Sequence, residues 1–322
     1  MRIRSVYLVA YIVLAISCLA GCKSVVFDDL GSCPHGIDFK FYRQTPCELT
    51  PAYPSDIRQV RVFAFDEKDV LIGEFSDKGI VLSADYALPA TFHCSGKLTF
   101  VAWGGSDLSV FDFSGFKTGV TVKNEMKVSL RMNGSKKIAS APGPLYVGLS
   151  SVVLENPKDV GSMYAQVKFN MKELTYKVHL TVESVGEPFP ADDEFVISIE
   201  DDNGVYDFNG AIASGDRFEY TCSTSANGTS GALKADFMLM KLEKGRNARL
   251  SITKKTTGDT FYTANLVEDI IMYSGQSGVP PYSLECDHDF PITLKLQYKD
   301  KTWMLVQATV LDWNVVSRPI EL

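Results

Sequence analysis

The feature that most constrains the fold of this chain is a succession of short apolar segments separated by turn residues. Some alternate apolar with polar residues, as 37–41 does, which is typical of a half-buried strand. Others, such as 60–65, are nearly continuous apolar runs that end in turn residues. Strands of about five to eight residues at intervals of about ten predict an all-β sandwich or barrel. The expected strands are 37–41, 60–65, 70–72, 98–103, 120–122, 126–130, 145–148, 166–169, 175–182, 195–199, 217–222, 234–240, 248–253, 260–266, 292–298 and 303–311.

Long helices are not expected, because no window beyond about ten residues keeps a clean helical period. The best helical candidate is the short segment 267–273. A seam around 151–162, punctuated by Asn156-Pro157-Lys158-Asp159, divides the chain into two regions of similar style. We therefore expect an N-terminal β-sandwich over 37–155 and a C-terminal β-sandwich over 156–322.

The N-terminus carries a basic start, one apolar run and the tetrapeptide Leu19-Ala20-Gly21-Cys22. These are the marks of a secretory signal, and the tetrapeptide resembles the bacterial lipobox, whose cysteine is acylated. The alternatives are an ordinary signal peptide and a transmembrane anchor, but the run is short for a span of roughly 20 residues. The sequence predicts a lipoprotein signal peptide over 1–21, acylation of Cys22 and a lipidated tether over 22–36.

The net charge of the chain argues against two classes of binding partner. The formal net charge is −7, and loss of the signal leaves 30 basic against 39 acidic residues, or about −9. Such a chain has no basic stripe to meet phosphates, which argues against nucleic acid as a partner. It also argues against electrostatic binding to anionic lipid, so acyl chains on Cys22 would have to supply the membrane affinity.

The cysteines leave their pairing open. Cys18 lies in the signal and Cys22 would carry lipid, so an odd number remains and at most two disulfides can form. Cys33 and Cys47 are near enough in sequence to pair, but sequence cannot decide it, and the simplest expectation is small buried side chains. None has the Cys-x-x-Cys spacing of a metal or redox site. The five remaining cysteines are Cys33, Cys47, Cys94, Cys222 and Cys286.

No catalytic, metal or cofactor site is expected. The chain has no nucleophile elbow and no phosphate-binding glycine loop, and an enzyme would need a convergent set of groups that cannot be assembled here. The densest group of possible metal ligands, Cys286-Asp287-His288-Asp289, is interpreted as a polar turn because no second cluster completes a shell. His179 is expected on one face of a sheet. The acidic segment Glu200-Asp201-Asp202-Asn203-Gly204 lacks the spacing of a calcium loop and predicts a solvated hairpin turn.

Several motifs, taken in order, resemble the Bacteroides-type fimbrial anchor proteins, the family of the minor and major fimbrium anchors of Porphyromonas. The resemblance spans nearly the whole chain, although Leu88-Pro89-Ala90 and Phe92-His93 depart from the family pattern. It implies two transthyretin-like β-sandwiches in an outer-membrane protein that holds the base of a fimbrium, a type V pilus. It also implies joining of subunits by β-strand exchange. The matching segments are Leu19–Cys22, Asp28–Leu30 with Cys33-Pro34, Val60–Asp66, Phe100–Gly105, Cys286–Ile292 and Leu311–Trp313.

The resemblance raises two questions about the ends of the chain. Shaft subunits of this family lose their first strand after an arginine; Arg43 and Arg58 follow the first strand here, but we expect no cleavage, because it would part the body from its lipid. At the other end, Pro319 limits the tail to an edge or an extension. The tail either completes the C-terminal sandwich in cis or is donated to a fimbrial subunit. The residues that would make this subunit contact are Val315, Val316, Ile320 and Leu322.

A second function from another class is a surface lipoprotein that binds glycans through loops of the sandwich. Exposed aromatic clusters in loops would favour it, and Pro280-Pro281-Tyr282 is the one hint in the sequence. The order of the motifs favours the fimbrial anchor.

Overall fold

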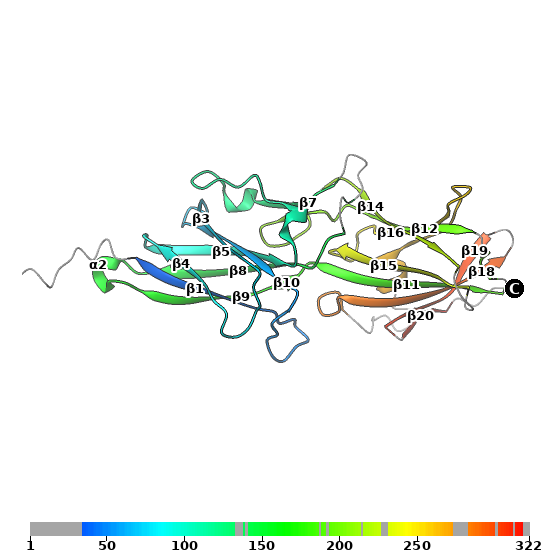
Figure 1. Ribbon diagram of the computed structural model, residues 1–322, viewed down its shortest axis with the longest axis horizontal. Helices are drawn as coiled ribbons and strands as arrows, with labels where there is room; N and C mark the ends of the chain where they lie inside the picture. Colours follow the sequence, from blue (N-terminus) through cyan, green and yellow to red (C-terminus); the bar gives the residue numbers. More distant parts are fainter. Residues whose placement is uncertain are drawn as a thin grey trace, which may run out of the picture.

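The computed structural model describes residues 34–132, 138, 141–186, 188–190, 193–213, 215–226, 231–272, 283–299, 302–311 and 313–317. The molecule is elongated, with two β-sandwiches arranged end to end (Figure 1). The prediction of an all-β protein with two tandem sandwiches is confirmed.

The N-terminal sandwich packs a three-stranded sheet, in the order β4-β1-β9, against a five-stranded sheet, in the order β10-β8-β5-β2-β3. Apolar side chains of alternating positions, among them Ile37, Phe39 and Val62, fill the space between the sheets. The strands are β1 (His35–Tyr42), β2 (Gln59–Phe65), β3 (Leu71–Lys78), β4 (Leu88–Phe92), β5 (Gly96–Gly105), β8 (Leu145–Leu154), β9 (Tyr164–Asn170) and β10 (Lys172–Glu173).

The central strands β2 and β5 are buried on both faces, which explains their nearly continuous apolar sequences. Val62 and Phe100 point into the N-terminal core, whereas Phe63 and Trp103 join a second apolar cluster on the opposite face. That second cluster continues without interruption into the core of the C-terminal sandwich. The two halves therefore share buried apolar surface.

The C-terminal sandwich packs a five-stranded sheet, β15-β11-β18-β19-β20, against a four-stranded sheet, β14-β12-β16-β17. A short π-helix, η4 (Leu266–Ile271), follows β17 and buries Leu266, Val267, Ile270 and Ile271. The strands are β11 (Thr175–Val185), β12 (Glu194–Asp201), β14 (Phe218–Ser225), β15 (Leu233–Met240), β16 (Arg249–Lys254), β17 (Thr260–Asn265), β18 (Asp289–Lys299), β19 (Thr302–Val310) and β20 (Trp313–Ser317).

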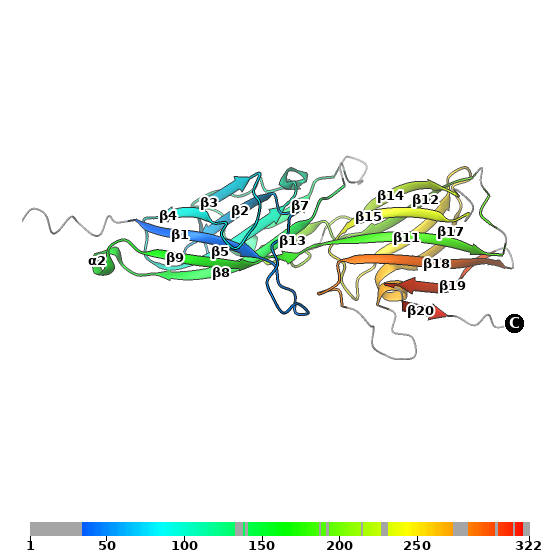
Figure 2. The same cartoon turned by 60° about the horizontal axis from the view of Figure 1, so that its bottom comes forward.

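A small sheet, β13-β7-β6, crosses the junction between the sandwiches (Figure 2). β6 and β7 belong to the long connection between β5 and β8, whereas β13 follows β12 of the C-terminal half. Antiparallel pairing of Val205–Asp207 with 127–129 ties that connection to the C-terminal half. The remaining elements are β6 (Phe111–Asp112), β7 (Lys127–Leu130), β13 (Val205–Asp207), η2 (Leu108–Val110), η3 (Lys123–Glu125) and α2 (Pro157–Val160).

Three local expectations differ from the structure. Residues 120–122 form a turn and a single bridge from Val122 to Val70, not a strand. Strand β4 spans Leu88–Phe92, where the sequence predicts no strand. The expected domain division at 155/156 falls two strands ahead of the change in sheet pairing, because β9 pairs in parallel with β1 and β10 pairs with β8 of the N-terminal sandwich. The short helical segment expected from residue 267 corresponds to η4.

Candidate functional site

The first strand is held in the middle of its sheet. β1 pairs antiparallel with β4 and parallel with β9, and its inward side chains Ile37, Phe39 and Phe41 are buried. The Phe39 ring lies 5.0 Å from Phe100 and 5.8 Å from Phe169, so the strand contributes a large share of the aromatic packing. The groove that removal of such a strand would open is therefore filled by the chain itself.

The peptide bond after Arg43 is fixed on both sides. Arg43 exchanges two backbone hydrogen bonds with Ala52, at 2.8 and 2.7 Å. The next residue, Gln44, donates its amide to Asn170 Oδ1 and accepts from Asn170 Nδ2, each at 2.9 Å. The Arg43 side chain is mostly buried and forms an ion pair with Glu48 at 3.0 Å.

Arg58 has an exposed side chain, but its backbone is bound into the sheet edge. Its amide donates to Gly105 O at 2.9 Å, and its carbonyl accepts from the amides of Gly79 and Ile80. β2 begins one residue later. Neither arginine lies in a segment that is free to leave the fold.

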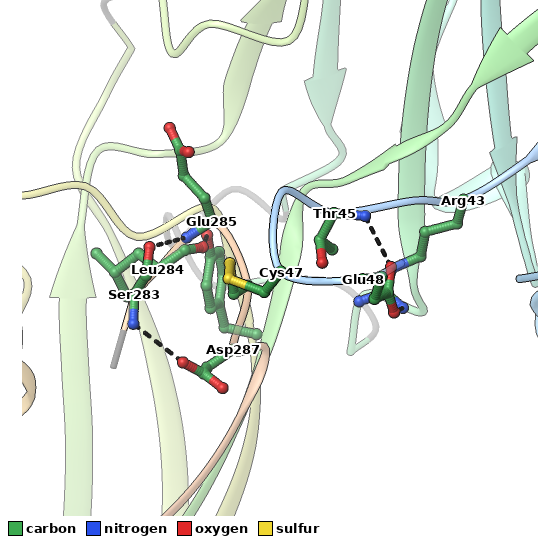
Figure 3. Close-up of a disulfide and its surroundings, with 10 residues drawn as sticks. Arg43, Thr45, Cys47, Glu48, Ser283, Leu284, Glu285 and Asp287 are labelled. Carbon is green, nitrogen blue, oxygen red and sulfur yellow. Dashed lines mark hydrogen bonds and ion pairs between the residues drawn. A yellow bond between two sulfur atoms is a disulfide. The ribbon is translucent and has the colours of Figure 1, made fainter. Parts of the chain in front are cut away.

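The two sandwiches are joined covalently by a disulfide between Cys47 and Cys286, which are 239 positions apart (Figure 3). Cys47 lies in the loop that follows β1, and Cys286 lies in the turn before β18. Figure 3 shows this loop and the turn over Ser283–Asp287 facing each other across the junction. Within the turn, Asp287 accepts a hydrogen bond from the Ser283 amide at 3.0 Å. Tyr176 donates its hydroxyl to Leu284 O at 2.6 Å.

Glu173 lies where the chain passes from one sandwich to the other. Its side chain is 13% exposed, and burial raises the pKa of Glu173 to about 7. The Arg43 Nε lies 3.8 Å from its carboxylate, too far for a hydrogen bond, so the guanidinium offsets burial only in part. Tyr146 donates to Asp56 at 3.1 Å beside it, and burial raises the pKa of the Tyr146 hydroxyl well above its ordinary value.

A cleft of about 720 Å³ opens at this junction, and residues of both sandwiches line it. Leu149 and Asn170 come from the N-terminal half, and Lys241 and Glu285 from the C-terminal half. Its mixed charges and open shape fit a seam between domains better than an enclosed pocket for one small ligand.

The four residues of Cys286-Asp287-His288-Asp289 turn in different directions. Cys286 is in the disulfide, Asp287 caps the Ser283 turn, and His288 Nδ1 lies 3.1 Å from Thr175 O. Burial lowers the pKa of His288. Across the described part of the chain, no three His, Cys, Asp or Glu residues are grouped as metal ligands.

His179 lies on the outer face of its sheet, whereas the sequence predicted only that it would lie on one of the two faces. Its Nδ1 lies 2.6 Å from Asp236 Oδ1 on β15, and its Nε2 lies 3.3 Å from Asp289 Oδ1 on β18. This row of side chains links three neighbouring strands.

The acidic turn at 200–204 is not the solvated hairpin that the sequence predicted. Asp201 and Asn203 are buried, and Asn203 Nδ2 donates to Met240 O and Lys241 O, both at 3.1 Å. Burial raises the pKa of Asp201 to about 6. The turn fastens β12 to the end of β15, because the side-chain amide of Asn203 donates hydrogen bonds to two backbone carbonyls that would otherwise be buried without a donor.

The C-terminal strand stands at the edge of its sheet. β20 pairs antiparallel with β19, with Val316 opposite Ala308 and Ser317 opposite Gln307. Among the described residues it is the last strand of that sheet. Val315 and Val316 thus lie on an edge strand in cis, while Ile320 and Leu322 lie outside the described residues, as do Cys22 and Pro280-Pro281-Tyr282.

The described residues include no helix of the length and apolar character needed to cross a bilayer.

Comparison with known proteins gives the architecture a family. Residues 30–319 match the family of fimbrillin-A associated anchor proteins Mfa1 and Mfa2. The chain belongs to this fimbrial anchor family. It is 30% identical to the minor fimbrium anchoring subunit Mfa2 of Porphyromonas gingivalis over 310 residues, which cover 94% of this chain and 92% of that protein.

Solved structures share this fold. The fimbrial anchor protein Mfa2 of Porphyromonas gingivalis has a TM-score of 0.76 at 30% identity, covering 89% of this chain and all of that one. Proteins of Bacteroides thetaiotaomicron and Bacteroides ovatus, each 18% identical, share the fold with TM-scores of 0.72 and 0.66. The match to the Bacteroides thetaiotaomicron protein covers 89% of this chain and 99% of that one, and the match to the Bacteroides ovatus protein covers 92% of this chain and 98% of that one.

The sequence did not predict the features that join the two sandwiches, namely the buried Glu173 and the Cys47–Cys286 disulfide. Glu173 stands beside Leu174 in an ordinary strand pattern, and Cys47 and Cys286 carry no spacing signal. The one available sign was the odd set of cysteines, which allowed a bridge but did not indicate its partners.

Proposed function

We propose that this chain is an outer-membrane lipoprotein that anchors the base of a fimbrium at the cell surface. Membership of the fimbrial anchor family over nearly the full length carries the proposal. The lipobox ending at Cys22 and the acidic mature chain support acyl chains as the link to the membrane.

The proposed link to the shaft is β-strand complementation, in which main-chain hydrogen bonds give strength and alternate side chains give register. β1 fills its own groove between β4 and β9, so that groove is not open to a donated strand. The C-terminal end is the part that can be given away, because β20 is held on one side by β19 alone among the described strands. In this proposal Val315, Val316, Ile320 and Leu322 enter the groove of a fimbrial subunit.

The lipid link is tested with Cys22→Ala in cells that assemble fimbriae. We expect the variant, with any fimbriae it holds, in the medium rather than in the outer-membrane fraction. A Cys22→Ala chain that stays in that fraction with fimbriae attached would show that another device holds it. Cys18→Ala, which alters the signal but not the acylation residue, is the matched control.

Strand donation is tested by deleting 315–322. Loss of fimbrial attachment by a folded and lipidated body supports donation, whereas normal attachment rejects it. A degraded body would instead show that the segment is part of the C-terminal core.

The partner is tested by pull-down of the native protein. Recovery of a polymerising fimbrial subunit supports the anchor, and recovery on a glycan column alone supports the glycan-binding alternative. Mass analysis of the surface protein tests retention of β1: a mature N-terminus at Gln44 or Gln59 would contradict it.

A further inference from the structure

Three exposed apolar side chains flank the end of the N-terminal sandwich where β1 begins. By strand alternation, Val153 faces the outer side of the five-stranded sheet and Tyr164 the outer side of the three-stranded sheet. Val153 is 63% exposed near the end of β8, Val160 is 47% exposed in α2, and Tyr164 is 84% exposed at the start of β9. The three belong to one continuous stretch that turns around this end of the molecule, as both views show (Figures 1 and 2). We refer to these three residues as the apical patch.

The apical patch lies beside the point where the described chain begins. Gly36, two residues after Pro34, pairs with Tyr164 in the parallel ladder of β1 and β9. The Tyr164 ring covers this glycine so closely that its Cδ1 would lie 2.6 Å from a Cβ added at Gly36. The largely exposed side chain of Tyr164 thus packs against the start of β1.

The length of the preceding chain limits how far this end can be from Cys22. Pro34 lies twelve positions after Cys22, and at full extension this length of chain reaches only about 40 Å. The molecule is elongated, with the hairpin of β18 and β19 at the opposite end. An acylated Cys22 therefore keeps the patch end within reach of the bilayer and favours the other end pointing away.

The chemistry of the patch suits a lipid surface. Tyrosine is enriched at membrane interfaces, where its ring meets acyl chains and its hydroxyl meets headgroups. The exposed charged neighbours are of both signs: Lys97 lies opposite Val153, Glu155 precedes α2 and Asp159 lies within α2. Contact with lipid would thus rest on apolar burial rather than on attraction to anionic headgroups.

We propose that the apical patch rests on the bilayer and holds the sandwich pair upright, with the C-terminal sandwich outermost. This inference rests on the proposed lipid anchor at Cys22. It adds a second, non-covalent contact that sets the orientation of the body, so that the β20 edge lies in the half directed away from the membrane.

The test uses the full acylated chain in phosphatidylcholine vesicles, with and without brominated acyl chains. Tyr164→Trp places a reporter in the patch, and Tyr298→Trp is the matched control, because Tyr298 is 55% exposed near the β18–β19 hairpin. For Tyr164→Trp we expect the tryptophan fluorescence to shift to the blue on reconstitution and to be quenched by brominated lipid. Both changes should exceed those of the unsubstituted chain. We expect neither for Tyr298→Trp.

Equal quenching of both reporters in a chain that floats with the vesicles would overturn the inference while leaving the lipid anchor intact. A mature chain recovered from cells without acyl chains on Cys22 would overturn both. A second variant, Val160→Glu with Tyr164→Glu, should still float but leave Lys97 as reactive toward a water-borne amine reagent as it is in detergent. Protection of Lys97 in that variant equal to that in the unsubstituted chain would count against the patch.

Discussion

The first and last described strands of this protein are held in opposite ways. β1 is the middle strand of its sheet, with β4 on one side and β9 on the other, and it buries Ile37, Phe39 and Phe41. β20 is an edge strand that pairs with β19. Both are terminal segments of a sandwich, yet only β1 is enclosed by its neighbours.

This difference bears on how an anchor and a shaft subunit differ. A strand with partners on both edges and buried aromatic side chains leaves only at a large cost in free energy, because ladder hydrogen bonds and apolar burial are lost together. An edge strand can exchange one pairing partner for another at little net cost. The comparison between β1 and β20 can be tested on the free energy of unfolding, from the largest expected effect to the smallest.

Truncation of Phe39 should have the largest effect. Phe39→Ala removes a fully buried ring that contacts Phe75, Phe100 and Phe169. We expect a loss of about 3–5 kcal/mol in the free energy of unfolding, measured by urea denaturation. Asp38→Ala, at an exposed position of the same strand, is the control and should change little. Similar effects of the two variants would show that β1 is not held through its buried face.

Removal of the junction disulfide should come next. Replacing Cys47 and Cys286 together by serine frees the loop after β1 from the C-terminal half. We expect the free energy of unfolding to fall by about 2–4 kcal/mol, because the unfolded chain loses a long-range constraint. Cys222→Ser, at a thiol outside the disulfide, serves as the control in the same denaturation experiment. An unchanged midpoint would exclude a stabilising role for the bridge.

The buried carboxyl of Glu173 should make stability depend on pH. Its folded pKa of about 7 lies above the ordinary 4.5, so the folded state binds the proton more tightly than the unfolded state. The contribution of Glu173 to stability is therefore fully present below pH 4.5 and declines as the pH rises to 7 and ionisation of the buried carboxyl becomes favoured. Glu173→Gln should remove the part of this decline that comes from Glu173, on the order of 2–3 kcal/mol, in denaturation curves collected across that range, whereas the part that comes from the raised pKa of Asp201 remains. The exposed Glu155→Gln should keep the whole decline; a Glu173→Gln chain with an unaltered pH profile would place the cause elsewhere.

Deletion of 315–322 should have the smallest effect on the folded body. The described part of this segment gives up edge pairing with Gln307 and Ala308, which corresponds to about 1 kcal/mol of net hydrogen bonding. Urea denaturation of the truncated chain measures it directly. A loss as large as that of Phe39→Ala would end the contrast between the two strands and mark β20 as core.

Sequence alone determined the features that depend on neighbouring residues. The alternation over 37–41 predicts a half-buried strand because side chains of a strand point to opposite faces in turn, and β1 shows that pattern of burial. The run 60–65 predicts a strand as well, and the order of several short motifs along the chain indicates the family.

Tertiary structure decided what depends on residues far apart. The sequence did not predict β4, because proline is rare within strands and Pro89 lies in this one. The proline is tolerated because β4 is an edge strand, where a missing amide donor is harmless; Pro89 lies opposite Asp38. Val120 is β-branched yet 68% exposed in a turn, because local propensity gives way where no sheet neighbour is present. The parallel pairing of β9 with β1, the bond from Cys47 to Cys286 and the burial of Glu173 all join distant segments. No local pattern records such contacts, since they arise only when the packed core brings those segments together.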